Sequence, residues 1–223
     1  MDLLHHLAEQ GAVAGTTVVA AEQTAGRGSR GRGWHSPRGG LWLSMLLRPA
    51  RTGVELLSLR AGLAVAQSLD RLGPGIGLKW PNDLMWGERK LGGVLCEARW
   101  AAAAVCWVSV GVGLNVRNPI APELAGKAAA LIELNGEATV DGVLALVLPG
   151  LRSLEMVRPR LTPEEQAQLT ARDWLRGRAL AGPIEGRADG IASDGSLHIV
   201  RPDGSSAALR AGSVVLADRP APS

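Results

Sequence analysis

Apolar and polar residues alternate along this chain with two periods, one helical and one typical of strands. Residues 2–11 present one apolar helical face, which Asp2 caps and Gly11 ends. Short apolar runs predict strands, the first of them buried, at residues 16–21, 41–47, 77–80, 84–86, 90–97 and 105–112. Residues 87–89 predict the turn of a hairpin.

Further helices are predicted from the residues that open them. Thr52 and Glu55 form a capping-box pair at the start of the strongest helical pattern. Thr139 caps a predicted helix that reaches about residue 157, and Thr162 precedes another.

The character of the chain changes after Trp174. Residues 183–217 hold short β-like runs that two strong turn sequences separate, at 193–195 and 202–204. The pattern predicts an α+β or α/β fold with a mixed sheet. We expect a catalytic domain in residues 1–174 and a small β-barrel in residues 175–223.

Composition and charge exclude several classes of protein. With 46% hydrophobic and 20% charged residues among 223, the chain can bury a core and is not disordered. The weakly polar stretch 101–114 is shorter than the roughly 20 residues that span a bilayer. No signal segment follows Met1, and Cys96 and Cys106 cannot form a disulfide framework. We therefore expect a cytoplasmic protein with no membrane partner, and a net charge of +3 does not indicate nucleic acid.

Residues 22–40 form a loop rich in glycine and arginine. Gly26, Gly28 and Gly31 match the dinucleotide-binding fingerprint, but the glycines and prolines that follow forbid the helix this motif requires. The loop instead carries four guanidinium groups: Arg27, Arg30, Arg32 and Arg38. Because guanidinium groups bind carboxylate and phosphate bidentately, the loop is predicted to order around an anionic ligand. The alternative is a solvated arginine loop that contacts RNA.

Two of the three lysines of the chain, Lys79 and Lys90, flank the predicted hairpin. Since arginine is used nearly everywhere else, each remaining lysine indicates a position that needs a compact ammonium. Lys90 precedes paired glycines at a strand start, which fits a charge directed at a ligand. Asp83 is either a turn cap or a partner for a metal or an incoming amine.

Gly111 and Gly113 alternate in the predicted strand that ends near Asn115. Alternate glycines in a strand mark close approach by a ligand or another backbone, with tight packing against a helix as the alternative. Asn115 is placed either to bind a phosphate-bridging Mg²⁺ or to cap the next turn.

These segments together resemble the biotin protein ligases, whose catalytic domain carries a GRGR-type loop ending in Trp, a KWPND block, a KLGG strand and a GxGxN strand. The four occur here in the same order, at residues 26–34, 79–83, 90–97 and 111–115. The resemblance covers most of residues 1–174, and the C-terminal part is similar to the family's small SH3-like barrel. The chain resembles the monofunctional members that lack an N-terminal DNA-binding domain, so no DNA partner is expected.

The resemblance implies an ATP-dependent ligase acting in two steps. Biotin and ATP would give biotinyl-5′-AMP and pyrophosphate, with Mg²⁺ as the accompanying ion. The biotinyl group would then pass to one lysine of a biotin carboxyl carrier protein or domain of acetyl-CoA carboxylase. The resemblance leaves open whether the enzyme is a monomer or a homodimer.

The family's functional residues carry over position by position. By resemblance, Lys90 bridges the biotin carboxylate and the α-phosphate, Lys79 adds positive potential, and Asp83 orients or deprotonates the acceptor lysine. The implied biotin-binding residues are Gln23, Gly26, Arg27, Gly28, Ser29, Lys90, Gly93, Leu95, Gly111 and Gly113. The implied nucleotide-binding residues are Arg27, Arg30, Arg32, Trp34 (against adenine), Asn82, Lys90 and Asn115, with Asn115 also beside Mg²⁺.

Three departures from the family pattern carry expectations of their own. The chain begins at the first helix, without the preceding Ser-Thr turn that contacts biotin, so either the start is placed too late or part of the pocket is missing. Ser29 stands where a basic residue is usual, and weaker retention of the adenylate is expected. Ser213 and Ala217 stand where the barrel often has Glu and Arg.

Three other functions remain open from the sequence. A lipoate or octanoate transferase shares the catalytic fold, and a degenerate ligase would bind biotin poorly without turnover. A distant alternative is an RNA-binding module built on the arginine loop, which would bind RNA in a salt-sensitive way.

Overall fold

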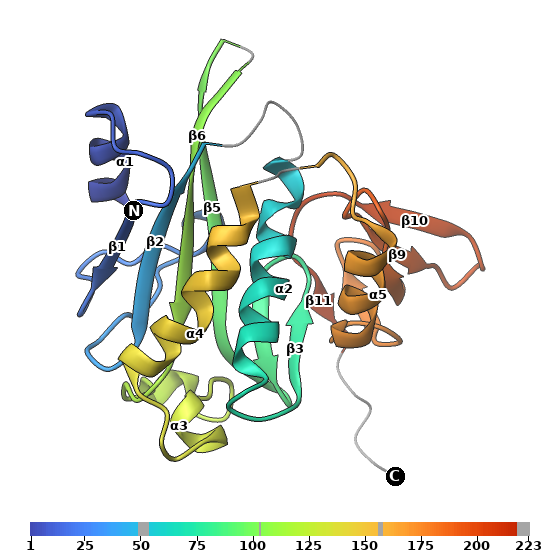
Figure 1. Cartoon of the computed structure of the whole chain (residues 1–223). Coiled ribbons are helices and arrows are strands. Elements are labelled where there is room, and N and C mark those ends of the chain that lie inside the picture. The colour runs from blue at the N-terminus through green and yellow to red at the C-terminus, as the bar shows by residue number, and fades with distance from the viewer. Residues whose placement is uncertain (49–53, 103, 156–157, 218–223) are drawn as a thin grey trace.

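Two antiparallel sheets carry the fold, as the computed structural model in Figure 1 shows for residues 1–48, 54–102, 104–155 and 158–217. The larger sheet has the strand order β1-β2-β6-β5-β4-β3. Its strands are β1 (Thr17–Ala20), β2 (Leu41–Leu47), β3 (Ile76–Lys79), β4 (Asp83–Trp86), β5 (Arg89–Ala101) and β6 (Ala104–Leu114). The α+β class is confirmed, and each predicted strand of this sheet is present.

Two expectations about this sheet are corrected. Every neighbouring strand pair is antiparallel, whereas a mixed sheet was predicted. The reason is that β3 to β6 follow one another as a meander, and the helical connection after β2 reaches the far edge of the sheet. β1 is half-exposed rather than buried, because it lies at the other edge and, among the described strands, pairs only with β2.

The described helices are α1 (Asp2–Glu9), α2 (Leu57–Leu69), α3 (Leu131–Leu134), α4 (Val140–Arg152) and α5 (Pro163–Arg172). Thr139 and Thr162 cap α4 and α5 as predicted, and Thr162 forms a full capping box with Glu165. The predicted cap at Thr52 lies outside the described residues. The helix predicted to reach about residue 157 is shorter, because α4 ends at Arg152 and a 3-10 turn, Ser153–Glu155, follows it. Asp2 does not cap α1. None of the described helices has the length and hydrophobicity needed to cross a membrane.

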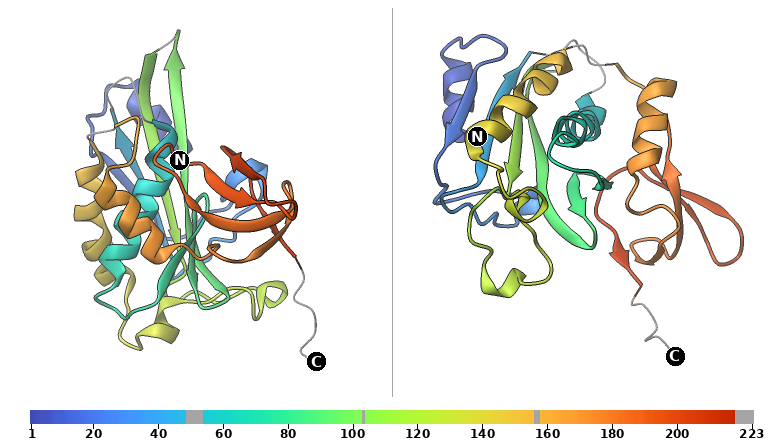
Figure 2. Two further views of the ribbon diagram at one scale, coloured as in Figure 1. Left: turned by 90° about the vertical axis from the view of Figure 1, so that its right-hand side faces the viewer. Right: turned by 60° about the horizontal axis from the view of Figure 1, so that its bottom comes forward.

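The two faces of the larger sheet are used differently. α2 and α4 pack side by side on one face, over a core that includes Val94, Val110 and Val112 (Figures 1 and 2). The opposite face is covered in part by α1, whose Leu4 packs against Leu46. The loop between β1 and β2 crosses the rest of that face (Figure 2, left).

A five-stranded antiparallel sheet in the order β10-β9-β8-β7-β11 confirms the predicted C-terminal β module. Its strands are β7 (Ala179–Gly182), β8 (Gly186–Ile191), β9 (Leu197–Val200), β10 (Ser206–Leu209) and β11 (Val215–Leu216). One continuous apolar cluster joins this sheet to the rest, and the Trp80 indole donates to the Gly195 carbonyl at 2.9 Å. The division into domains at residues 174 and 175 stays a prediction.

Candidate active site

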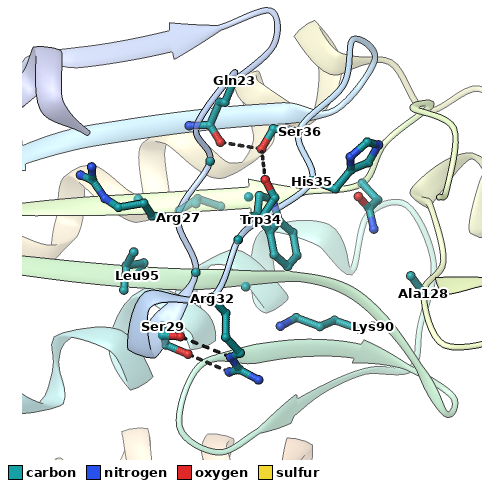
Figure 3. Close-up of a pocket in the computed structure, with 18 of the residues that line it drawn as sticks. Gln23, Arg27, Ser29, Arg32, Trp34, His35, Ser36, Lys90, Leu95 and Ala128 are labelled. Carbon is teal, nitrogen blue, oxygen red and sulfur yellow. Dashed lines mark hydrogen bonds between the residues drawn. The ribbon is translucent and has the colours of Figure 1, made fainter. Parts of the chain in front are cut away.

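The floor of the candidate site is built from glycines and one leucine on the sheet face opposite α2. Side chains alternate across a strand, so the register pairs Gly93–Gly113 and Leu95–Gly111 face the same side. They lie beneath a cavity of about 830 Å³, which Figure 3 shows between the sheet and the β1–β2 loop.

The structure brings most of the predicted site residues together around this cavity. Those that line it are Gln23, Gly26, Arg27, Gly28, Ser29, Arg32, Trp34, Asn82, Asp83, Lys90, Gly93, Leu95, Gly111, Gly113 and Asn115. Two predicted residues, Lys79 and Arg30, are not among the lining residues.

The β1–β2 loop folds back on itself over the floor. The Trp34 amide donates to the Gly26 carbonyl at 2.8 Å, and the Ser36 hydroxyl donates to the Gln23 side-chain oxygen at 2.6 Å (Figure 3). A Cβ atom on Gly26 would lie 2.3 Å from the Trp34 carbonyl oxygen, a distance that requires the backbone to move. Glycine is therefore needed here for close approach within the loop.

The Trp34 indole lies directly on the floor. Its Nε1 is 2.7 Å from the position of a Cβ on Gly113, and its ring meets Trp42 edge-on with centroids 6.4 Å apart. The Lys90 ammonium stands 5.0 Å from the ring centroid, within cation–π range. The buried Trp34 Nε1 has no hydrogen-bond partner in the described part of the chain.

Lys90 is placed in the cavity by the β4–β5 hairpin. Its Nζ is 2.5 Å from an Asp83 carboxylate oxygen, and Asp83 stands opposite Gly93 in the β-ladder. The two side chains are 30% and 21% exposed. The arrangement thus presents one cation and one carboxylate at the same end of the cavity.

Lys79 and Arg30 make contacts elsewhere. The Lys79 ammonium lies 5.4 Å from the Trp174 ring centroid, and burial lowers the pKa of Lys79, against the opposing effect of Asp83. Arg30 has a left-handed φ of 62° and donates to the Ser213 hydroxyl at 2.8 Å, which ties the loop to the C-terminal sheet.

The side-chain amides of Asn82 and Asn115 are engaged with the protein. Asn82 donates to the Val94 carbonyl at 2.7 Å, and Asn115 donates to the Ala129 carbonyl at 3.2 Å. The Asn115 Oδ1 accepts from Asn118 at 3.1 Å. Within the described residues, no group of three His, Cys, Asp or Glu side chains could hold a metal ion. The assignment of Asn115 to a position beside Mg²⁺ stays a prediction.

No local pattern in the sequence predicts the far wall of the cavity. The segment 118–128 is held against β5 by a bond from the Lys90 amide to the Lys127 carbonyl, at 2.8 Å. Asn118, Lys127 and Ala128 line the cavity from this wall, and Ser36 lines it from the loop. Lys127 had a signal, since it is the third remaining lysine, but only tertiary pairing brings it to the site.

Comparison with known proteins places this fold among the biotin and lipoate protein ligases. The model of the biotin/lipoate A/B protein ligase family matches residues 1–115. The chain is 37% identical over 210 residues to the biotin–acetyl-CoA-carboxylase ligase of Mycobacterium tuberculosis, covering 86% of this chain and 74% of that protein. It is 35% identical over 215 residues to the bifunctional ligase/repressor BirA of Bacillus subtilis, covering 90% of this chain and 66% of that protein.

A solved structure agrees with these relatives. The biotin protein ligase from Aquifex aeolicus in complex with biotin and ATP superposes with a TM-score of 0.81 at 30% identity, covering 96% of this chain and 94% of that one. The chain belongs to the biotin/lipoate A/B protein ligase family. It spans about two thirds of the length of the Bacillus subtilis relative.

Proposed function

We propose that this chain is a biotin protein ligase that activates biotin with ATP and transfers it to a lysine of a carrier protein. The observation that carries the proposal is the position of Lys90, whose ammonium projects into the cavity beside Trp34 above a floor of glycines. The similarity to a biotin protein ligase in complex with biotin and ATP supports these two substrates.

In the first step, a carboxylate oxygen of biotin attacks the α-phosphorus of ATP. The bond from that phosphorus to the bridging oxygen breaks, and pyrophosphate leaves with the electron pair. Because two anions must meet, catalysis depends on charge neutralisation and positioning. We assign the neutralisation to Lys90 and the cover over both reactants to the loop residues Gly28, Ser29 and Arg32.

In the second step, the amine of the acceptor lysine attacks the acyl carbon and AMP leaves. The amine must be deprotonated first, because an unperturbed lysine has a pKa of about 10.4. Asp83, 2.5 Å from Lys90 Nζ, is the carboxylate that we assign to orient the acceptor amine and accept its proton. In this proposal Lys90 acts in the first step and Asp83 acts in the second.

Mg²⁺ and the carrier enter this proposal as accompanying species. We treat Mg²⁺ as part of the ATP substrate, because Asn115 is committed to Asn118 and Ala129. The relatives named as acetyl-CoA-carboxylase ligases support a biotin carboxyl carrier domain as the acceptor.

The proposal is tested by ATP–pyrophosphate exchange, which reports the first step without an acceptor. Exchange that depends on biotin, and that lipoate does not replace, would support the proposal. Exchange with lipoate alone would assign the chain to the lipoate branch of its family. No exchange with either compound would contradict an adenylating ligase.

The RNA-binding alternative gains no support from Arg27 or Arg38, two of the four loop arginines. Arg27 is paired with Asp2 and Glu97, and Arg38 lies 3.6 Å from Glu22. An RNA-binding surface needs cations that are free to meet phosphates.

Replacing Lys79 with methionine separates activity from stability. Desolvation lowers the pKa of Lys79, so the folded state carries an unfavourable contribution wherever the ammonium is charged in both states. That contribution is present at neutral pH and fades as pH rises through the folded-state pKa.

We expect Lys79→Met to leave the free energy of unfolding at pH 7 unchanged or higher, while the exchange rate falls about tenfold. Denaturant unfolding at pH 7 and at alkaline pH, together with exchange assays, checks this; lower stability at pH 7 would contradict it.

A further inference from the structure

A chain of hydrogen bonds beside the cavity connects α1 to the glycine-rich loop. The indole of Trp107 donates to His5 Nδ1 at 3.0 Å, and His5 Nε2 lies 3.0 Å from a Glu97 carboxylate oxygen. The Arg27 guanidinium contacts the same Glu97 and also Asp2. We call His5, Glu97 and Asp2 the Arg27 clamp.

The clamp stands on the same sheet face as the cavity floor. Glu97 follows Leu95 by two residues on β5, so strand alternation directs both to that face. α1 covers the neighbouring part of the face, where Leu4 and Ala8 pack against Leu46. The Glu97 carboxylate therefore lies between α1 and the loop.

The hydrogen-bond partners determine where the proton of His5 lies. An indole N–H can only donate, so His5 Nδ1 accepts and carries no proton. The proton of the neutral ring is then on Nε2, where it is donated to the Glu97 carboxylate. Because His5 is 5% exposed, little water competes for this bond. Glu97 is thereby held in one orientation.

Arg27 is held by both carboxylates. Its Nη1 donates to one Asp2 oxygen at 2.9 Å, its Nη2 lies 2.7 Å from the other, and its Nε is 3.4 Å from Glu97. The hydrogen bond from Arg27 holds the pKa of Asp2 below its usual range. The positive charge of Arg27 is thus neutralised within the protein, and its backbone forms a bridge with Gly33 at the cavity.

We propose that His5 is a positioning residue which, by orienting Glu97, fixes Arg27 and holds the backbone of the loop over the end of the cavity floored by Leu95 and Gly111. In this account Arg27 serves the site through its backbone and not as a phosphate ligand. The inference rests on the proposed function, since this end of the cavity is where we place biotin.

Kinetics of the exchange reaction test the role of His5 in substrate binding. His5→Leu is expected to raise the KM for biotin about tenfold, the scale of one hydrogen bond to a charged group, with the KM for ATP nearly unchanged. His5→Gln, which keeps a donor for Glu97, is expected to restore most of the loss. His6→Leu is the matched control, because His6 lies on the same helix but is 64% exposed and contacts its helical neighbours Glu9 and Gln10.

A double-mutant comparison tests whether His5 acts through Arg27. If it does, His5→Leu combined with Arg27→Met is expected to raise the KM for biotin no more than Arg27→Met alone. Additive effects would overturn the proposal.

Limited trypsin digestion of the native, substrate-free protein tests the clamp independently of function. Trypsin cleaves after Arg27, Arg30 and Arg32, and releasing Arg27 is expected to raise the cleavage rate in His5→Leu and in Glu97→Gln but not in His6→Leu. Unchanged cleavage in both clamp variants would overturn the proposal. If the wild type shows no biotin-dependent exchange while the clamp variants are still cleaved faster, the proposed function fails and the clamp stands.

Discussion

Lys90→Met is expected to reduce biotin-dependent ATP–pyrophosphate exchange by about 10³-fold, the upper range for removing one charge-stabilising group from an active site. The physical reason is that the ammonium lies in the cavity, at 5.0 Å from the Trp34 ring centroid and 2.5 Å from an Asp83 oxygen. Without it, the repulsion between the carboxylate and the α-phosphate loses the compensating charge that we assign to Lys90. The exchange rate at saturating biotin and ATP measures the loss.

The same substitution should leave the fold intact. Lys90 and Asp83 are partly exposed, so breaking their ion pair is expected to change the free energy of unfolding by no more than about 1 kcal/mol. Arg89→Met is the control on the same strand, because Arg89 stacks on Trp86 and pairs with Glu133 away from the cavity. Near-normal exchange in Lys90→Met, or an equal loss in Arg89→Met, would remove Lys90 from the chemistry.

Arg60→Met is expected to lower the free energy of unfolding by about 1.5–3 kcal/mol, the range for hydrogen bonds that involve a charged group. Arg60 is 6% exposed on α2 and donates to Glu165 at 2.8 Å and to the carbonyls of Arg158 and Arg160. It thereby fixes α5 and the segment before it to the main core. Denaturant unfolding measures the loss, with the exposed Arg71→Met as control.

The pH dependence gives this prediction a second readout. Burial raises the pKa of Glu165, but bonds from Arg60 and from the Thr162 amide outweigh it, and the net shift is downward. A carboxyl group with a depressed pKa stabilises the fold above its unfolded-state pKa, and the contribution is lost as pH falls through the folded-state value. The difference between wild type and Arg60→Met should therefore shrink under acid conditions. A difference independent of pH would mean that the Glu165 pair contributes little.

Local patterns predicted much of this fold. β2 spans the predicted residues 41–47, because this run between glycines and Arg48 is apolar at every position except Ser44. The helix start at Thr162 could be predicted from the sequence, because the two partners of its capping box are three residues apart. The antiparallel arrangement of the sheet could not be predicted from local patterns, because it depends on which edge of the sheet the connection through α2 reaches.

The site residues also divide into those that the sequence predicts and those that only the folded structure reveals. Glycines such as Gly26 and Gly113 carried a signal in the sequence, because close approach excludes a side chain. The contact of Arg30 with Ser213 and the contact of His5 with Glu97 join residues far apart along the chain. Such contacts form when α1 and the C-terminal sheet pack beside the loop. The spacing of residues along the sequence therefore does not predict them.

The central claim is that this chain makes biotinyl-5′-AMP with Lys90 as the neutralising charge. The most direct test mixes the protein with equimolar biotin and ATP for a single turnover, followed by mass spectrometry of the quenched nucleotides. The account predicts biotinyl-5′-AMP in the wild type, its near absence in Lys90→Met, and its conversion to AMP when a carrier domain with an acceptor lysine is added. Unreacted ATP in the wild type, or equal adenylate in both proteins, would contradict it.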